Sequence, residues 1–411
     1  MSRKDVVLAA VDELRDDLVE LLQVLIRIPT LNPPGEAYED FVVEFRARLD
    51  AYGYTTEVHD VPEADLPALA PFGEGLPRPN LLATLNRGDG PVVHLNGHYD
   101  VVPVGNDWTR DPFGGELSDG WIHGRGAADM KSGLAAQVIA VEALRRTEWA
   151  GTIVHSAVPD EETVGVRNAG MGWLVEQGLV KADALIITEP FGPDGVGIGH
   201  KGAIWGEITL HGKQAHGSSP RLGSNAVEAM ARYLYAIDRH VRPLLEARVT
   251  DYGVTPDEPR ATLSFDTIRG GVATNIVPDR CTVTFNRRLV PGEDLDAARE
   301  ELLAPLKALG LPYDYHETYS TQPVLVGEEE PVVQAACRAV RALGLEPRIL
   351  ISAGSDDQRF VVQGAGITNS LVYGPGTTGL SHISDERISV DDLVLGTKGL
   401  ALILAELLEA T

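Results

Sequence analysis

The chain has 411 residues, more than one ordinary domain holds, so we expect two domains, each with its own apolar core. Hydrophobic residues make up 44% of the chain and charged residues 23%, which is the profile of a soluble globular protein. The formal net charge of -25 argues against nucleic acid or an anionic membrane surface as a partner, because both repel a strongly negative protein.

Cysteine use and the N-terminal sequence restrict the class of protein further. Cys281 and Cys337 lie far apart and outside any CxxC pattern, so neither a disulfide framework nor a thiolate zinc site is expected. The segment MSRKDVVLAAVDELRDDL carries acidic residues throughout its apolar pattern, unlike a signal peptide. No apolar run approaches the length of a membrane span. We therefore expect a cytoplasmic protein without a membrane partner.

The first half of the chain predicts alternating helices and strands. Apolar residues at helical spacing over 11–25 indicate one long amphipathic helix, and the stretch 61–80, rich in Pro and Gly, indicates a surface loop. Similar patterns predict helices at 38–52, 134–144 and 171–176, and strands at 55–59, 80–85, 92–96, 151–158 and 184–188. This alternation is typical of an α/β domain.

The pattern changes near residue 200. Residues 200–317 read as strand, helix, strand, strand, helix and strand, which predicts a compact α+β module of ferredoxin-like type. Alternation resumes with a helix at 331–343, strands at 348–351 and 367–372, and a helix at 390–409. We therefore predict an α/β fold: a mixed-sheet, three-layer catalytic domain over 1–199 and 318–411, and an inserted dimerisation or lid domain over 200–317.

Three predicted strands end in side chains that bind metals. His98 and Asp100 follow the strand 92–96, Glu161 and Glu162 follow the strand 151–158, and Glu189 follows the strand 184–188. Open α/β sheets place their active sites at the carboxyl ends of strands. His98 and Asp100 share a face, so the Asp100 carboxylate can accept a hydrogen bond from one imidazole nitrogen while the other binds a metal.

Other residues allow two interpretations each. Of the adjacent Glu161 and Glu162, one can bind a metal while the other acts as a general base, although an isolated pair is more often a solvated loop. Asp129 lies in GRGAADMKSG just before a predicted helix, where an aspartate either caps the helix or binds a metal. His382 follows the strand 367–372 in a Gly-rich loop, and a lone loop histidine is usually solvated.

Two other sequence patterns lack the features that a dinucleotide site or a serine nucleophile would require. GIGHKG at 197–202 matches GxGxxG, but a strand pattern follows it where a dinucleotide site needs a helix. We interpret Gly197, Gly199 and Gly202 as hinge or turn residues. GSSPR after His216 lacks the GxSxG pattern of a nucleophile elbow, which argues against a serine hydrolase.

Eight motifs together resemble one family. In chain order they are HLNGHYDVVP, GRGAADMKSG, PDEET, ITEP, KQAHGSSP, GGVATNIVP, GSDDQRF and GLSHISDERI. They cover essentially the whole chain and are similar to the zinc aminoacylase and peptidase family, which contains acetylornithine deacetylase, succinyl-diaminopimelate desuccinylase, aminoacylase and glutamate carboxypeptidase.

The resemblance implies a centre of two divalent metal ions per chain, with zinc expected first and cobalt or manganese as alternatives. Asp129 would bridge the ions, His98 and Glu189 would hold one, and Glu162 and His382 would hold the other. Imidazole and carboxylate ligands without thiolates suit such a hydrolytic site. The resemblance also implies a cis peptide between Asp129 and Met130.

Catalytic and binding roles follow from the same resemblance. Glu161 would be the general base, Asp100 would orient His98, and His216 would reach across a homodimer to the oxyanion. Three further residues would bind a substrate carboxylate, a ligand that suits a guanidinium, although arginines also form ordinary ion pairs. They are Arg359, Arg288 and Asn275. The wording of GSDDQRF resembles the desuccinylases.

We therefore expect a metal-dependent amidohydrolase that removes an N-acyl group from a small amine or amino acid bearing a carboxylate. One alternative is a carboxypeptidase or dipeptidase on the same scaffold. Another is a hydrolase of an unusual C–N bond, such as a formyl, carbamoyl or arylamine group. A non-catalytic binding protein would have lost a metal ligand or the base, and none is missing from this sequence.

Overall fold

The computed structural model describes residues 2–163, 165 and 167–409 and contains two compact units. The larger unit is built from three stretches of chain and the smaller from two, so the chain enters and leaves each unit more than once. The larger unit comprises Met1–Gly199, Val326–Ile351 and Asp356–Thr411, and the smaller comprises His200–Leu325 and Ser352–Ser355.

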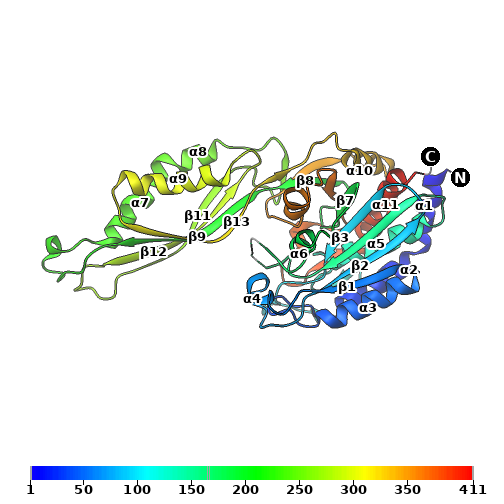
Figure 1. The fold of residues 1–411 in the computed structure, drawn as a ribbon, viewed down its shortest axis with the longest axis horizontal. Helices are drawn as coiled ribbons and strands as arrows, with labels where there is room; N and C mark the ends of the chain where they lie inside the picture. Colours follow the sequence, from blue (N-terminus) through cyan, green and yellow to red (C-terminus); the bar gives the residue numbers. More distant parts are fainter. Residues whose placement is uncertain (1, 164, 166, 410–411) are drawn as a thin grey trace. The chain divides into compact units, whose positions relative to one another are not determined.

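The larger unit is organised around a mixed sheet (Figure 1). Its central strands run parallel to one another, and antiparallel strands flank them on both sides, which confirms the predicted mixed sheet. The order of its strands is β1 (Thr55–Asp60), β2 (Pro79–Arg87), β6 (Gly151–Val158), β3 (Val92–His98), β7 (Ala184–Ile187), β16 (Ser370–Val372), β8 (Gly195–His200) and β15 (Arg348–Ser352).

Helices pack on both faces of this sheet. One group packs together, with α5 also lying on β3: α1 (Arg3–Glu13), α2 (Arg15–Ile26), α5 (Lys131–Leu144), α10 (Pro331–Ala342) and α11 (Val390–Leu407). Helix α3 (Tyr38–Ala51) lies on β1 and β2. A separate apolar cluster joins α4 (Leu66–Leu69) and α6 (Met171–Glu176) to alternate residues of β7, such as Leu185 and Ile187. The result is the predicted three-layer arrangement.

Two local predictions were wrong. The first amphipathic pattern spans two helices, since Leu14 leaves the helical conformation with ψ 11° and both α1 and α2 pack on α5. Gly197 and Gly199 lie inside strand β8, and Gly202 begins β9 (Gly202–His211), so none of the three is a turn residue, while the boundary between the two units falls after Gly199. A Cβ on Gly197 would stand 2.8 Å from the side chains of Phe191 and Val372, which explains the glycine by close packing.

The segment over 105–130 contains a second, smaller sheet. It includes a hairpin of β4 (Glu116–Ser118) and β5 (Trp121–His123), and β17 (Arg387–Ser389) pairs with β5. This small sheet joins the segment before Asp129 to the segment after His382, although some 260 residues separate them in sequence.

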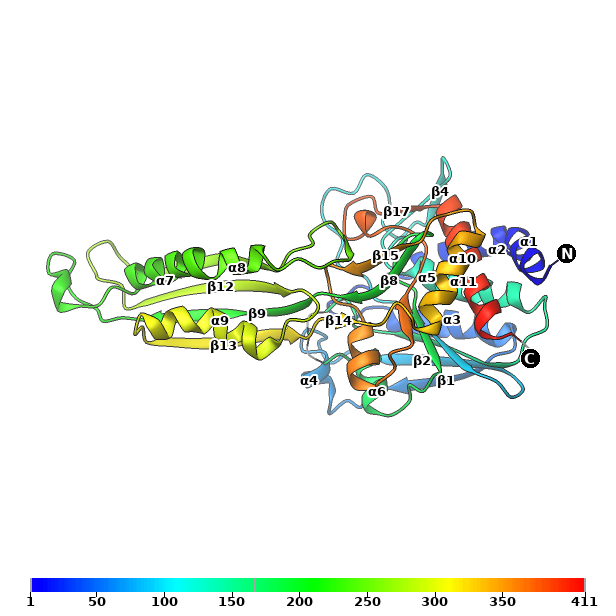
Figure 2. The same cartoon turned by 90° about the horizontal axis from the view of Figure 1, so that it is seen from above.

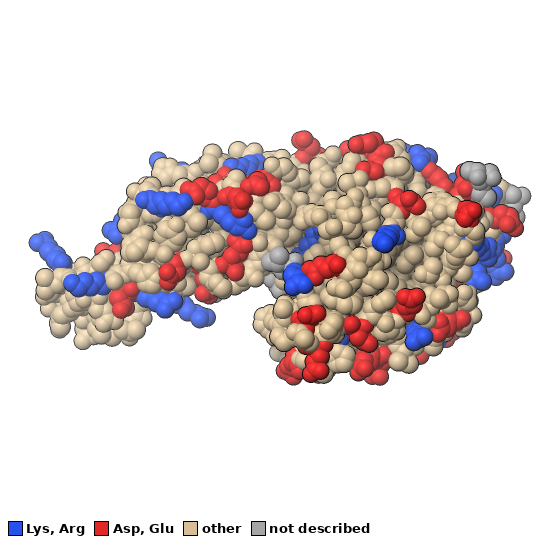
Figure 3. All heavy atoms as spheres, viewed as in Figure 1, with Lys and Arg blue, Asp and Glu red and all other residues tan. Residues whose placement is uncertain are grey.

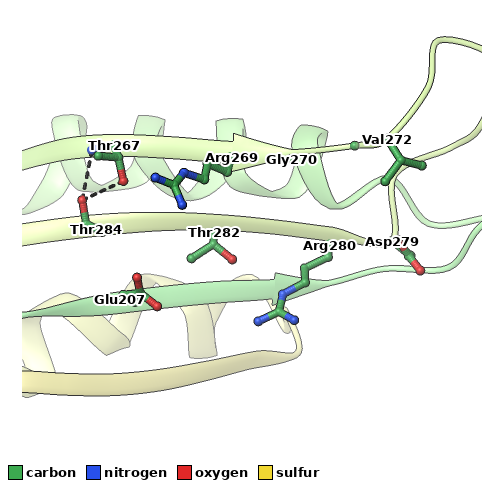
Figure 4. Close-up of a pocket in the computed structure, with 10 residues that line it drawn as sticks. Glu207, Thr267, Arg269, Gly270, Val272, Asp279, Arg280, Thr282 and Thr284 are labelled. Carbon is green, nitrogen blue, oxygen red and sulfur yellow. Dashed lines mark hydrogen bonds between the residues drawn. The ribbon is translucent and has the colours of Figure 1, made fainter.

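The smaller unit has the connectivity expected of a ferredoxin-like module. Its elements follow the order β9, α7 (Ala226–His240), β11 (Thr262–Gly270), β12 (Arg280–Leu289), α9 (Leu295–Ala308) and β13 (Tyr313–Thr321). Its antiparallel sheet has the order β11-β12-β9-β13, and α7 and α9 cover one face (Figures 1 and 2). Figure 4 shows polar side chains of the open face, including the hydrogen-bonded pair Thr267 and Thr284 beside Glu207.

Charged side chains of both signs lie on the described surface. On the face seen in Figure 3, acidic side chains are interspersed with basic ones, and the basic ones do not gather over one element. Among the described residues, none of the helices combines the length and the apolar character that crossing a bilayer requires.

Two core histidines make stability sensitive to acid. His94 Nε2 lies 2.8 Å from Ser156 Oγ, and His155 Nδ1 lies 3.1 Å from Gln137 Oε1. Burial lowers the pKa of His94 to about 4 and the pKa of His155 to about 3. Unfolding exposes both rings to water, where histidine takes up a proton below about pH 6.5.

We predict that the free energy of unfolding falls as the pH drops from about 6.5 to about 4, because the unfolded chain binds protons that the folded chain excludes. Each histidine contributes up to about 1.4 kcal/mol per pH unit to this slope. Denaturant unfolding at a series of pH values measures it. His155→Gln reduces the slope, while the exposed His240→Gln leaves it unchanged. Equal slopes for His155→Gln and the unchanged chain contradict the explanation.

Candidate metal centre

Three parallel strands of the larger unit end at one edge and present the candidate ligands there. His98 is the last residue of β3 and pairs with Val158, the last residue of β6. Asn96 of β3 pairs with Ile187, the last residue of β7. Glu161 and Glu189 lie in the turns just beyond β6 and β7, so the parallel register brings three distant segments to one place.

His98 lies between the sheet and two carboxylates. Its Nε2 is 3.2 Å from Asp129 Oδ1 and 3.4 Å from Glu189 Oε1, and its Nδ1 is 2.9 Å from the Asp100 carbonyl oxygen. Because Nδ1–H donates to that carbonyl, the Nε2 lone pair of a neutral ring faces the carboxylates.

Asp100 orients this ring through its backbone carbonyl and not, as expected, through its carboxylate. The Asp100 carboxylate stands 3.5 Å from His98 Nδ1, so the backbone carbonyl rather than the carboxylate accepts the hydrogen bond. The carboxylate accepts the backbone N–H groups of Glu161 at 3.2 Å and Glu162 at 3.1 Å. Asp100 therefore holds the turn that carries the two glutamates.

Asp129 faces two imidazoles at once. Its Oδ1 lies near His98, and its Oδ2 lies 3.4 Å from His382 Nε2. His382 Nε2 is also 3.0 Å from the Glu162 carboxylate. The N-cap of α5 is Met130, without a side-chain capping bond, so Asp129 does not cap the helix. The peptide between Asp129 and Met130 is cis, as the family resemblance implies.

The cluster concentrates negative charge. Burial raises the pKa values of Glu161 and Glu189 well above their usual range. The nearby charge of Glu189 raises the pKa of Glu161 further, and that of Asp129 raises the pKa of Glu189 further. His98 lowers both pKa values in part. Hydrogen bonds with Asp129 and Glu162 raise the pKa of His382 to about 11. The carboxylates thus favour a positive charge between them.

The donor set fits a divalent cation. Ligand atoms of His98, Glu161 and Glu189 lie within 4.8 Å of one another, as do those of His98, Asp129 and Glu162. Carboxylate oxygens and imidazole nitrogens are ligands that zinc, cobalt and manganese accept. A cation there would offset the burial and the mutual repulsion that raise the pKa values of Glu161 and Glu189.

A buried network that the sequence did not reveal supports the glutamate turn. Asp160 precedes Glu161 with φ +63°, a left-handed conformation that is unfavourable for a residue with a side chain. Its carboxylate accepts hydrogen bonds from Asn32 Nδ2 at 3.0 Å, Tyr38 OH at 3.1 Å and Arg78 Nε at 2.7 Å. Arg78 lies in the stretch predicted as a surface loop, yet it is 1% exposed.

A hydrogen bond from strand β3 also holds the segment that carries Arg359. Asn96 Nδ2 donates to Asp357 Oδ2 at 2.9 Å, and the Asp357 charge contributes to the raised pKa of Glu161. Arg359 follows two residues later, buried, with its guanidinium over the Phe360 ring. The segment therefore lies near Glu161, and the Arg359 side chain packs on an aromatic ring.

The smaller unit brings two predicted residues together. Gly217 N donates to the Asn275 carbonyl at 2.7 Å, which places His216 and Asn275 on adjacent loops. His216 Nδ1 accepts the backbone N–H of Ser218 at 3.1 Å, so a neutral ring carries its proton on Nε2. Arg288 lies on β12 instead, with its guanidinium over the Trp205 ring and its Nε 3.1 Å from Asn286 Oδ1.

Comparison with known proteins agrees with this geometry. Residues 94–406 match the model of peptidase family M20/M25/M40. The chain is 30% identical to the succinyl-diaminopimelate desuccinylase of Methylorubrum extorquens, over 91% of this chain and 94% of the relative. It is 36% identical to the enzyme of that name from Cereibacter sphaeroides, over 76% and 82%.

A solved structure shares the fold. The M20 family metallo-carboxypeptidase Sso-CP2 from Sulfolobus solfataricus superposes with a TM-score of 0.73 at 21% identity, covering 94% of this chain and 98% of that one.

Proposed function

The chain belongs to peptidase family M20/M25/M40 and is a metal-dependent hydrolase of amide bonds, and from that premise we propose that it removes an N-acyl group from a carboxylate-bearing amine or amino acid. The desuccinylase names of relatives at 30% and 36% identity support this substrate class. Peptide hydrolysis by a carboxypeptidase or dipeptidase is the second candidate, favoured by the name of the metallo-carboxypeptidase that shares the fold.

The observation that carries the proposal is the position of Asp129 between two imidazoles. Its two oxygens face His98 and His382 separately, and each imidazole has a second carboxylate beside it, Glu189 or Glu162. We propose that the centre would hold two divalent ions per chain, zinc first, with His98 and Glu189 on one side, Glu162 and His382 on the other, and Asp129 shared between the two sides. Such ions supply Lewis acidity that polarises an amide carbonyl and lowers the pKa of a water molecule.

Glu161 is the proposed general base. Its carboxylate lies within 4.8 Å of the ligand atoms of His98 and Glu189, but the close contacts of the two imidazoles go to Asp129, Glu162 and Glu189. The raised pKa of Glu161 suits a carboxylate that accepts a proton from water and delivers it to the leaving amine. The hydrogen bond from the Glu161 backbone N–H to Asp100 fixes the turn from which this side chain projects.

The smaller unit is proposed to supply substrate contacts and a homodimer interface. His216 presents Nε2–H as a donor, the form that an oxyanion requires, and we propose that it serves the site of a partner subunit. Arg288 and Asn275 of the smaller unit and Arg359 of the larger unit are proposed to bind the substrate carboxylate. The guanidinium groups suit this ligand, and Asn275 lies on the loop beside His216.

The function is tested with a substrate panel. We expect the metal-loaded protein to hydrolyse N-succinyl or N-acetyl amino acids faster than dipeptides, and a chelator to abolish the activity until zinc is restored, because the water needs a Lewis acid. Amine release measures turnover. Faster turnover of dipeptides supports the second candidate, and full activity in metal-free protein contradicts both.

The base is tested with Glu161→Gln. We expect kcat to fall by about 10² to 10⁴ while two metal ions remain bound, because the amide keeps the shape of the side chain without its basicity. Metal content by elemental analysis accompanies the rates. Glu162→Gln is the matched neighbour and is expected to lose metal as well as activity. Full activity in Glu161→Gln excludes the assignment.

Sharing of His216 between subunits is tested by mixing inactive variants. His216→Ala and Glu161→Ala chains are each expected to be inactive alone. After subunit exchange, about one quarter of the original activity should return, because half of the dimers are mixed and each of these contains one intact site. No recovery, despite exchange measured by mass spectrometry of differently labelled chains, contradicts the shared site.

A further inference from the structure

Glu386 has a buried carboxylate that accepts hydrogen bonds from the backbone of the Asp129 loop. It is 0% exposed and lies four residues after His382. Its Oε1 accepts the N–H groups of Gly126 at 3.0 Å, Ala128 at 2.9 Å and Asp129 at 3.1 Å. Three donors from one loop converging on one charged oxygen are a strong restraint on that loop.

The other oxygen of Glu386 extends the restraint to His382. Glu386 Oε2 lies 2.5 Å from Arg125 Nη1, and the same guanidinium nitrogen donates to the carbonyl of Ile383 at 3.3 Å. Arg125 also stacks over the Trp108 ring. One buried ion pair therefore links the backbone of Asp129 to the residue next to His382.

The turn that carries His382 depends on such outside contacts. His382 and Asp385 have φ values of +59° and +54°, which disfavour residues with side chains. The Asp385 carboxylate accepts Thr109 N at 2.9 Å and Thr109 Oγ1 at 2.7 Å. The His382 side chain is 51% exposed, so little packing holds the ring itself.

The opposite side of the centre is held differently. His98 ends strand β3, is 1% exposed and is oriented by the Asp100 carbonyl. Glu189 lies in the turn just beyond β7. Sheet pairing places His98 and the strand that leads to Glu189, and of the contacts described for this side only the Asp129 side chain belongs to the segment that Glu386 holds.

We propose that Glu386 is a positioning residue that fixes Asp129 and His382 relative to each other, so that its loss weakens divalent-cation binding at the His382–Glu162 side far more than at the His98–Glu189 side. The inference rests on the proposed two-metal function. Glu386 belongs to the motif GLSHISDERI, and the proposal gives it a positioning role in addition to the role of His382 in the same motif.

Zinc binding by the full-length Glu386→Gln protein tests the proposal. Glutamine keeps an oxygen acceptor but loses the charge that pairs with Arg125. We expect one zinc Kd to rise about 10- to 100-fold, as for other residues that orient metal ligands, and the second Kd to change less than about threefold. Competition with a chromophoric chelator measures both constants. Anomalous diffraction at the zinc edge should locate the retained ion between His98 and Glu189.

Two further variants separate positioning from general destabilisation. Asp385→Ala removes the Thr109 contacts from the partly exposed side of the turn, and we expect a smaller weakening at the same site. Asp194→Asn weakens an ion pair of the same unit, with Arg348, and should bind both ions as the unchanged protein does. Circular dichroism checks folding, and Asp385→Ala carries the test if Glu386→Gln does not fold.

The outcomes distinguish this inference from its premise. If the unchanged protein binds fewer than two ions, both the proposed centre and the role of Glu386 fail. If the unchanged protein binds two ions and the folded variants bind both with unchanged constants, only the role of Glu386 fails. Equal weakening at the two positions also overturns it, because the proposed restraint acts on one side.

Discussion

Repulsion among converging carboxylates is the constraint on which the rest of this structure depends. Asp129, Glu161, Glu162 and Glu189 meet at one edge of the sheet around two imidazoles, and burial with mutual repulsion raises the pKa values of the three glutamates. Such a cluster persists only where a cation offsets the charge and a rigid framework prevents the side chains from turning away. The parallel strands supply the first part of that framework, because their register fixes where each ligand segment begins.

The second part of the framework is a set of buried polar contacts around the ligands. The Asp100 carboxylate holds the N–H groups of Glu161 and Glu162, while its carbonyl orients His98. Asn32 Nδ2 joins that carboxylate to Asp160, which Arg78 also binds. On the other side, Glu386 holds the Asp129 loop. The segments of Glu161, Glu162 and Asp129 are thus tied through their backbone, so these candidate ligands are already positioned for a cation.

The sequence predicted the elements that carry the site better than the contacts that hold it. Strand ends at His98 and Glu189 follow from short apolar runs, which local patterning reveals. Arg78 was hidden because a stretch rich in Pro and Gly reads as solvent-exposed, whereas its guanidinium is buried against Asp160. Gly197 was misread because a glycine in a crowded strand and a glycine in a turn look alike in sequence. The break at Leu14 has no local signal, since the apolar spacing continues through it.

The sequence by itself determined the fold class, the alternation of elements and the chemical types of the candidate ligands, because hydrophobic period and residue type are local properties. Only the tertiary structure decided that Asp129 faces two imidazoles rather than capping α5, and that the Asp100 carbonyl, not its carboxylate, orients His98. It also brought Glu386 to the Asp129 loop across more than 250 residues of chain. These choices depend on the direction of individual atoms after distant segments have packed, and sequence spacing does not encode that direction.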